Sequence, residues 1–334
     1  MIIRERLEQW EREHLSQYAS LSENSKGRLR DEEQCDIRPV FQRDRDRIIH
    51  CKAFRRLKDK TQVFLSPEGD HYRTRLTHTI EVSQTARTLA KSLGLNEELA
   101  EAIALGHDLG HTPFGHAGER ALNRICPLGF EHSQQSVRTV DRLEKRGRGL
   151  NLTYEVRDGI LNHQTIGKPH TLEGKIVRLA DKIAYIHHDM DDAVRAGILK
   201  ESDVPKEIRD VIGDSTGARL DTLIHDIVTT SMGKADILQS PEVEKAMQDM
   251  RRFMFHNVYE NPVAKSEEGK AEALMETLYQ HFMKNIDEMP EEYLNLLSEG
   301  EPREQVVCDY VGAMTDRYAI SMYEKIYIPK SWKL

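Results

Sequence analysis

Long apolar runs are missing from this chain of 334 residues. No stretch approaches the 18 or so consecutive apolar residues that a membrane-spanning helix needs, so we expect no transmembrane segment and no membrane partner. The first residues, Met-Ile-Ile-Arg-Glu-Arg, are charged within four positions and lack the apolar centre of a secretory signal peptide. We therefore expect a cytoplasmic protein.

Cysteine and aromatic residues are also scarce. The four cysteines are scattered without a Cys-x-x-Cys pair, which argues against a disulfide framework and a zinc knuckle. Aromatic side chains make up 6% of the chain and charged ones 31%, a balance typical of helical proteins. The formal net charge of −8 argues against a globally basic nucleic-acid binder, although it allows a local basic patch.

Alternation with a period of two residues is almost absent, whereas apolar patterns with a 3.6-residue period recur throughout. This pattern predicts an all-α fold. We expect one compact helical body over 1–334, with a catalytic core at 40–200 and a C-terminal helical region at 205–334. Predicted helices lie at 3–15, 41–60, 77–93, from 97 onward, from 116 onward and at 173–190, and predicted breaks at 20–38, 66–70, 112–115, 147–151, 195–205, 262–270 and 299–302.

Four residues able to bind a metal lie on the apolar sides of three predicted helices. His78 and Asp181 each share a helix face with small or aliphatic residues, and His107, followed directly by Asp108, does the same. Any one of them alone is more often a hydrogen-bonded core residue or a cap. Together, two imidazoles and two carboxylates without a thiolate suit one divalent ion, Mn²⁺, Mg²⁺, Fe²⁺ or Zn²⁺, that leaves positions for water and substrate oxygens.

Ionisable residues crowd the segment that follows, at His111, His116, Glu119 and His132. His116 and Glu119 are three positions apart on a short predicted helix, so the carboxylate can orient the imidazole. An oriented imidazole is what a general acid needs when it protonates a leaving alkoxide near neutral pH. The alternative is that these histidines are simply solvated beside a loop. Their closeness to His107 and Asp108 argues against it.

A second line of polar residues begins at Asp181. Lys182, Tyr185 and Asp189 follow at i+1, i+4 and i+8, so the line extends for about 12 Å along the helix. That length suits a ligand with a phosphate at one end and a sugar at the other. Lys182 would neutralise phosphate, Tyr185 would stack on a ring and Asp189 would accept a hydrogen bond from a sugar hydroxyl. Alone, such residues usually form surface ion pairs or part of the core.

Five segments lie at 41–47, 54–64, 73–78, 106–119 and 179–185, and they contain most of the residues named above. Their order and spacing form a recognisable pattern. The fourth reads Gly-His-Asp-Leu-Gly-His-Thr-Pro-Phe-Gly-His-Ala-Gly-Glu, and the fifth reads Leu-Ala-Asp-Lys-Ile-Ala-Tyr. In these segments the chain closely resembles the HD-superfamily deoxynucleoside-triphosphate triphosphohydrolases, the family of the bacterial dGTPases and dGTPase-like proteins. The match extends over about residues 10–200.

The resemblance implies an HD-domain helical core with an additional C-terminal helical region, and a homo-oligomer, expected to be a hexamer. It assigns roles to three sets of residues. The metal ligands would be His78, His107, Asp108 and Asp181. The catalytic dyad would be His116 with Glu119, and His111 and His132 would contact the phosphate region. Arg75 and Lys182 would bind the triphosphate, and Gln62, Tyr185 and Asp189 would contact the deoxyribose and base.

We therefore expect metal-dependent hydrolysis of a deoxynucleoside triphosphate, dGTP or several dNTPs, to a deoxynucleoside and tripolyphosphate. A second interpretation is another HD phosphohydrolase, such as a nucleotidase or a cyclic-dinucleotide or alarmone hydrolase. A third is a nucleotide-sensing or single-stranded nucleic-acid-binding protein, because residues 41–60 hold eight Lys or Arg against three Asp. The commonest explanation of such a run is a solvated helix face. The sequence leaves open the preferred dNTP and whether a second dNTP binds as an activator.

Overall fold

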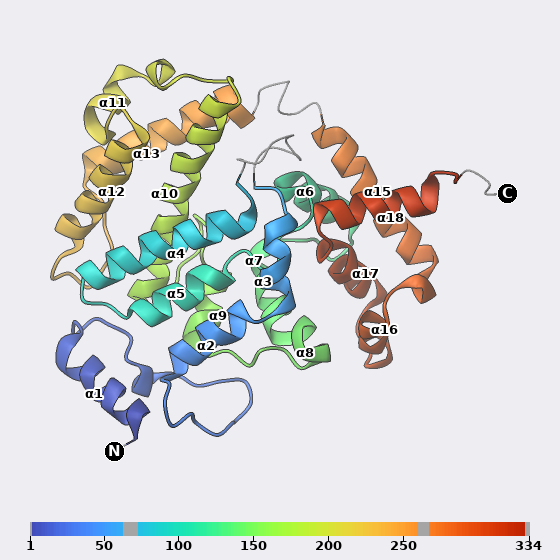
Figure 1. Cartoon of the computed structure of the whole chain (residues 1–334), viewed down its shortest axis with the longest axis horizontal. Helices are drawn as coiled ribbons and strands as arrows, with labels where there is room; N and C mark the ends of the chain where they lie inside the picture. The colour runs from blue at the N-terminus through green and yellow to red at the C-terminus, as the bar shows by residue number, and fades with distance from the viewer. Residues whose placement is uncertain (1, 63–72, 260–266, 331–334) are drawn as a thin grey trace.

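The computed structural model describes residues 2–62, 73–259 and 267–330, and helices joined by loops account for its architecture (Figure 1). Within these ranges, extended pairing is limited to two isolated bridges, Arg28 with Thr153 and Thr61 with Thr74. No helix in the described part of the chain is long and apolar enough to cross a membrane. The all-α prediction is confirmed, and the turn predicted at 66–70 lies outside the described residues.

The helices of the first two thirds of the chain are α1 (Ile3–His14), α2 (Val40–Ile49), α3 (Lys52–Arg56), α4 (Arg75–Ser92), α5 (Glu97–Gly106), α6 (Gly115–Ile125), α7 (His132–Arg138), α8 (Glu144–Gly147), α9 (Tyr154–Leu161) and α10 (Leu172–Arg195). Those that follow are α11 (Lys206–Ile212), α12 (Thr216–Ser231), α13 (Pro241–Met254), α15 (Glu268–Lys284), α16 (Glu291–Ser298), α17 (Arg303–Gly312) and α18 (Asp316–Tyr327). Single turns of 3₁₀ or π helix occupy 22–24, 57–59, 139–143, 201–203, 255–259 and 286–288.

Capping residues set the ends of the helices that carry the site. The Asn96 side chain accepts hydrogen bonds from the backbone N–H groups of Glu98 and Leu99 at 3.1 and 3.2 Å, so α5 begins where the sequence predicts. Thr171 caps α10 in the same way. After α4, Gly94 has a φ of +66°, the left-handed conformation that glycine adopts most readily and that ends a helix.

One expectation about an individual helix is wrong, and the exposure of another helix was not predicted. The helix predicted over 41–60 is interrupted, because α2 ends at Ile49 and Cys51 caps a separate α3 by accepting from the Phe54 N–H. The apolar stripe of α1 faces outward, and its Trp10 is 52% exposed. The buried side of α1 instead carries Glu11, whose carboxylate accepts hydrogen bonds from the backbone and hydroxyl of Ser22 at 2.7 and 2.8 Å.

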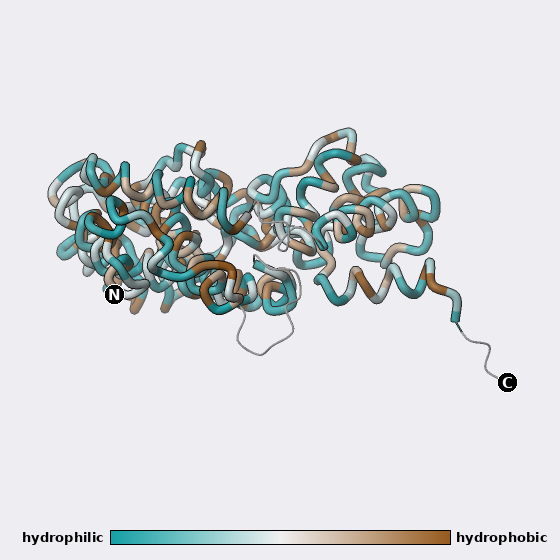
Figure 2. The backbone as a smooth tube through the Cα atoms, turned by 90° about the horizontal axis from the view of Figure 1, so that it is seen from above, coloured by the Kyte–Doolittle hydropathy of each residue, from teal (hydrophilic) through white to brown (hydrophobic). Residues whose placement is uncertain are grey.

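The apolar residues form two cores. The larger core is built from α2, α4, α5, α9 and α10 and also takes in α11, α12 and α13. The smaller core joins α6 to α15, α16, α17 and α18. The helices α15 to α18 form their own group on one side of the molecule, and the two termini lie at opposite ends (Figures 1 and 2). Since α6 directly follows the His107-Asp108 turn, the smaller core begins next to the candidate site.

A buried polar contact joins α7 to α17 between the two cores. Asp309 is fully buried and accepts hydrogen bonds from Arg138 Nε and Nη2 at 2.8 and 2.6 Å and from Gln135 Nε2 at 2.9 Å. Arg138 Nη2 also pairs with Glu301 at 2.7 Å, and the Arg138 side chain is half-buried. Removal of the Asp309 carboxylate would be costly, because the half-buried Arg138 charge and the buried Gln135 amide would lose their acceptor.

Replacing Asp309 by alanine should therefore lower the free energy of unfolding by about 3 kcal/mol. Urea denaturation followed by circular dichroism measures the change. The matched control is Glu299→Ala, which removes an exposed carboxylate that pairs with Arg142. This control should cost less than about 1 kcal/mol, since exposed ion pairs contribute little. Equal losses in the two variants would contradict the assigned role of Asp309.

Candidate functional site

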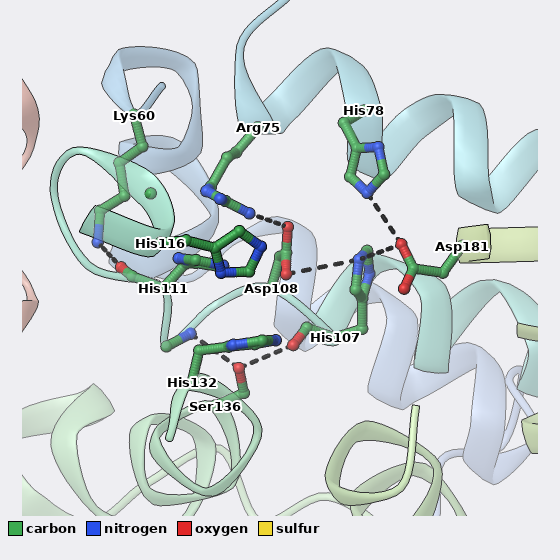
Figure 3. A network of polar contacts seen from close by, with 12 residues as sticks. Lys60, Arg75, His78, His107, Asp108, His111, His116, His132, Ser136 and Asp181 are labelled. Atoms are coloured by element: carbon green, nitrogen blue, oxygen red, sulfur yellow. Dashed lines mark hydrogen bonds and ion pairs between the residues drawn. The ribbon is translucent and has the colours of Figure 1, made fainter. Parts of the chain in front are cut away.

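Three helices bring the four predicted metal ligands together (Figure 3). His78 lies on the first turn of α4, His107 and Asp108 end α5, and Asp181 lies in the middle of α10. Donor atoms of His78, His107 and Asp108 lie within 4.8 Å of one another. Asp181 is outside that group, yet its Oδ1 lies 3.2 Å from His78 Nε2 and 3.8 Å from His107 Nε2. The four side chains therefore converge on one small volume.

The chemistry of these atoms fits a divalent cation. The Nδ1–H of His107 donates to the Ala104 carbonyl at 2.6 Å, so its Nε2 carries the lone pair. This Nε2 is buried and without a hydrogen-bond partner among the described residues, 3.6 Å from Asp108 Oδ1 and 3.8 Å from Asp181 Oδ1. Such separations are too long for hydrogen bonds. They are instead the separations expected between two donor atoms that bind the same ion, each at about 2.1 Å from it.

The two carboxylates of the cluster are held in their charged form. Burial alone would raise the pKa of Asp108, but His107 and the Arg75 guanidinium, which donates to its Oδ2 at 2.7 Å, hold that pKa well below its usual range. For Asp181, burial is likewise outweighed by the contact with His78 and by the other imidazoles, which lower its pKa. Ionised carboxylates beside imidazole nitrogens are a set of ligands that suits a hard or borderline cation.

Glu119 connects two of the other predicted histidines. Its Oε2 lies 3.1 Å from His116 Nδ1, while its Oε1 accepts from the backbone N–H of His132 at 2.8 Å and lies 2.9 Å from His132 Nδ1. Burial raises the pKa of Glu119, but the hydrogen bonds from His116 and His132 lower it far more. The predicted dyad is thus a three-membered chain, and the sequence did not predict the contact between Glu119 and His132.

His111 packs on this chain as a neutral ring. Its imidazole stacks on that of His132 with centroids 4.3 Å apart and planes 18° from parallel. Burial and the nearby Arg75 charge lower the pKa of His111 well below its ordinary value. A neutral imidazole can lie beside a guanidinium without electrostatic repulsion.

The loop between the metal cluster and α6 is strained and supported from two sides. Phe114 has a φ of +60°, unfavourable for a residue with a β-carbon. Its N–H donates at 3.0 Å to Asp316, the first residue of α18, and the other oxygen of Asp316 accepts from the Thr61 N–H at 2.9 Å. The Lys60 ammonium, whose pKa burial lowers to about 7, donates to the carbonyl of His111 and, at 3.1 Å, to that of Gly312.

α7 fixes the other side of the same loop. The Ser136 hydroxyl donates to the His107 carbonyl at 2.8 Å and accepts from the Gly110 N–H at 2.9 Å. A β-carbon at Gly110 would lie 2.2 Å from the Ser136 backbone nitrogen, closer than any real contact. The glycine in this segment is therefore required by the close approach of α7.

A cavity of about 1190 Å³ opens beside the metal cluster. Most of the predicted site residues line it, namely Gln62, Arg75, His78, Asp108, His111, His116, His132, Asp181, Lys182 and Tyr185. His107 and Glu119 do not line the cavity. His107 is hydrogen-bonded to the Ala104 carbonyl, and Glu119 to His116, which does line the cavity. Asp189 is buried on α10 and is not part of the lining, so its predicted contact with a sugar stays a prediction.

The sequence analysis missed His163, at the end of α9. This residue is 2% exposed, lines the cavity and has its ring 5.0 Å from that of His107 and 5.2 Å from that of His132. Burial and the neighbouring His107 lower its pKa to about 4. The signal was available, because Val156, Ile160 and His163 follow an i, i+4, i+7 pattern, as the apolar neighbours of His78 do.

Replacing Asp316 by alanine should loosen the loop at 112–118. Three hydrogen bonds to one buried carboxylate are lost, so the free energy of unfolding should fall by about 2 kcal/mol. Amide hydrogen exchange of peptides that contain Phe114 should become roughly tenfold faster or more. Asp287→Ala, at an exposed aspartate of the same region, is the control and should change neither quantity. Unchanged exchange at Phe114 in Asp316→Ala would contradict the supporting role.

Comparison with known proteins relates this geometry to a family. A family model described as "HD domain" matches residues 75–186, and one described as "Phosphohydrolase-associated domain" matches residues 237–325. The chain is 56% identical to a "Deoxyguanosinetriphosphate triphosphohydrolase-like protein" of Caldanaerobacter subterraneus subsp. tengcongensis, over 99% of this chain and 98% of the relative. Relatives with the same name from Clostridium tetani and Clostridium perfringens (strain 13 / Type A) are 47% and 50% identical, over 99% of this chain and 97% and 99% of theirs.

A solved structure shares the fold. The phosphohydrolase from Bacteroides thetaiotaomicron VPI-5482 matches with a TM-score of 0.53 and 17% identity, over 84% of this chain and 67% of that one. The HD match contains the four predicted metal ligands as well as His116, Glu119 and His163. The HD core and the C-terminal helical region are both confirmed, and the chain is a metal-dependent HD phosphohydrolase. On the strength of its identity to relatives along nearly its whole length, the chain belongs to the family of deoxyguanosinetriphosphate triphosphohydrolase-like proteins.

Proposed function

We propose that this protein hydrolyses deoxynucleoside triphosphates to a deoxynucleoside and tripolyphosphate. The observation that carries the proposal is the convergence, at one cavity wall, of the metal cluster, the His116–Glu119 pair and the cations Arg75 and Lys182. The names of the relatives, which point to deoxyguanosine triphosphate, support the same substrate class. A cavity of about 1190 Å³ is ample for one nucleotide, since pockets for ligands of that size measure roughly 300–1,000 Å³.

The charges around the cavity suit a polyphosphate. Burial lowers the pKa of Lys182, and the nearby guanidinium groups of Arg178 and Arg251 lower it further. All three cations line the cavity. Glu244 and Asp181, which also line it, raise the pKa of Lys182. A triphosphate beside them would relieve the mutual repulsion of the cations and form charge-assisted hydrogen bonds.

The other end of the nucleotide would meet Gln62 and Tyr185. Both line the cavity, and the Gln62 Oε1 is buried without a hydrogen-bond partner among the described residues. An amide oxygen in that state can accept a hydrogen bond from a sugar hydroxyl. Gln239, just before α13, and Gln248, within it, also line the cavity, so the C-terminal region would contact the base.

The reaction would be attack of water on the α-phosphorus with cleavage of its bond to the 5′-oxygen. His78, His107, Asp108 and Asp181 would hold one divalent ion, which when bound polarises phosphate oxygens and lowers the pKa of water. Arg75 and Lys182 would hold the phosphate oxygens in place. With Glu119 accepting the Nδ1–H of His116, the doubly protonated imidazole would give its Nε2 proton to the departing 5′-oxygen and keep its Nδ1–H.

Removal of the metal should abolish turnover reversibly. Treatment with EDTA followed by gel filtration should leave less than about 1% of the rate, because charge stabilisation and positioning supply most of the acceleration. Addition of Mn²⁺ or Mg²⁺ should restore it. Asp108→Ala and Asp181→Ala should stay inactive when metal is added, and mass spectrometry of the purified protein should show them depleted of metal. Wild-type rates in either variant would contradict the ligand assignment.

His116 should matter for catalysis without holding the metal. His116→Ala should lower kcat by about 10²–10⁴-fold, the range typical of general acid catalysis, and keep the wild-type metal content. His50→Ala, at an exposed histidine outside the cavity, is the control and should keep the wild-type kcat. Loss of metal in His116→Ala would instead make His116 a ligand.

Product analysis tests the reaction class. Each dNTP should be offered alone and then all four together, with Mn²⁺ or Mg²⁺, and the products separated by ion-exchange chromatography. The proposal expects deoxynucleoside and tripolyphosphate in equal amounts. Release of orthophosphate or pyrophosphate would instead identify another HD phosphohydrolase activity, and a cyclic dinucleotide offered in a parallel assay would be opened to a linear product only by a cyclic-dinucleotide hydrolase. A rate that appears only in the mixture would show that a second dNTP acts as activator.

Binding of single-stranded nucleic acid has weaker support. Much of the positive charge at 41–60 is neutralised, since Arg45 pairs with Glu98 at 2.6 Å and Arg47 with Glu32 at 2.5 Å. Lys52, Arg55, Arg56 and Lys58 line a groove of about 570 Å³, where Lys52 pairs with Glu292 at 2.7 Å. The hexamer, the activating dNTP and the cytoplasmic location stay predictions that rest on the sequence.

A further inference from the structure

His163 lies between His107 of the metal cluster and His132 of the histidine chain. The proposed reaction gives it no role. Its Nδ1 is 2.7 Å from the Ile160 carbonyl oxygen, and its Nε2 is 3.2 Å from His132 Nε2. His163 lies two residues after the end of α9, and Ile160, within α9, belongs to the larger core. The His163 ring is therefore held by a fixed acceptor on one side and faces the His132 imidazole on the other.

The hydrogen-bond pattern decides which nitrogen carries hydrogen. A carbonyl oxygen only accepts, so His163 Nδ1 must carry the hydrogen of that bond. In the neutral ring the Nε2 of His163 then holds a lone pair, and the short contact with His132 Nε2 requires a hydrogen on His132. His132 Nδ1 also donates, because its partner is the Glu119 carboxylate at 2.9 Å. His132 thus donates from both nitrogens.

A chain of four contacts between five residues results. It runs from the Ile160 carbonyl through His163, His132 and Glu119 to His116 Nδ1. Each contact fixes the direction of the next, since an imidazole that donates from both nitrogens between two acceptors has one ring orientation. Gln164 Nε2 lies 3.4 and 3.5 Å from the two nitrogens of His132, but an amide nitrogen only donates, so it cannot replace His163 as the acceptor.

We propose that His163 is a positioning residue: by accepting a hydrogen bond from His132 Nε2, it fixes His132 and Glu119 and so aims His116 Nε2 at the leaving 5′-oxygen. This inference rests on the proposed function for the role of His116, but the hydrogen bond itself does not. His163 neither donates to substrate nor supplies the proton that is transferred. Its effect is to keep the proton donor in the productive orientation.

The main alternative is that His163 supports the metal ligand His107, whose ring lies 5.0 Å away. In that case, loss of the His163 ring nitrogen would disturb metal binding. Measurement of the metal content therefore separates the two roles. If His163 acts only on the hydrogen-bonded chain that leads to His116, its loss leaves the metal bound to all four ligands.

The kinetic experiment compares three variants of the full-length protein. His163→Phe removes the acceptor and keeps an aromatic ring of similar size, while His163→Gln keeps an acceptor oxygen near the position of Nε2. His170→Phe, at an exposed histidine a few residues further on, is the matched control. We expect kcat to fall by about 10–100-fold in His163→Phe with KM and metal content unchanged, the loss typical of a supporting hydrogen bond. His163→Gln should regain most of the rate, and His170→Phe should match the wild type.

A spectroscopic readout makes the inference independent of activity. In Mg²⁺-loaded protein with ¹⁵N-labelled histidine, the imidazole nitrogens of His132 are assigned by loss of their signals in His132→Gln. We expect both nitrogens of His132 to carry hydrogen in the wild type and Nε2 to change in His163→Phe. If no dNTP yields tripolyphosphate, the proposed function fails while this measurement still decides the hydrogen bond.

Four results would overturn the inference. They are an unprotonated His132 Nε2 in the wild type, an unchanged kcat in His163→Phe, loss of metal in His163→Phe, and a His163→Gln variant as slow as His163→Phe with its metal in place.

Discussion

The close approach of two carboxylates and two imidazoles in one small volume is the constraint on which the rest of the molecule depends. Asp108 and Asp181 remain ionised in spite of their surroundings, and His107 Nε2 has no hydrogen-bond partner among the described residues. An arrangement of this kind is unfavourable unless a cation completes it. The helices α4, α5 and α10 must therefore meet at fixed positions, which their aliphatic sides secure by packing in the larger core.

The smaller core has a direct part in the site although it holds no metal ligand. It contains α6, which carries His116 and Glu119, and it supplies Asp316 and the Gly312 carbonyl to the loop before α6. The strain at Phe114 is offset by these contacts. The predicted metal ligands thus belong to one core and His116, the proposed proton donor, to the other, and the loop between them sets their relative position.

Much of the site was predictable because its residues are close in sequence or repeat along one helix. His116 and Glu119 are one helical turn apart, and Asp181 precedes Tyr185 by one turn, so spacing alone brought each pair together. The contact of Glu119 with His132 was not predictable in this way, since it depends on how α6 and α7 pack. The interruption of the helix predicted over 41–60 was also missed, because the apolar pattern continues across Cys51.

The sequence by itself determined the all-helical fold, the caps at Asn96 and Gly94 and the types of side chain that could bind a cation, because these depend on local periodicity and on chemistry. Only the tertiary structure decided that the apolar stripe of α1 faces solvent and that His163 joins the histidine chain. Both outcomes depend on which helices become neighbours, and contacts between distant segments leave no periodic signal in the chain.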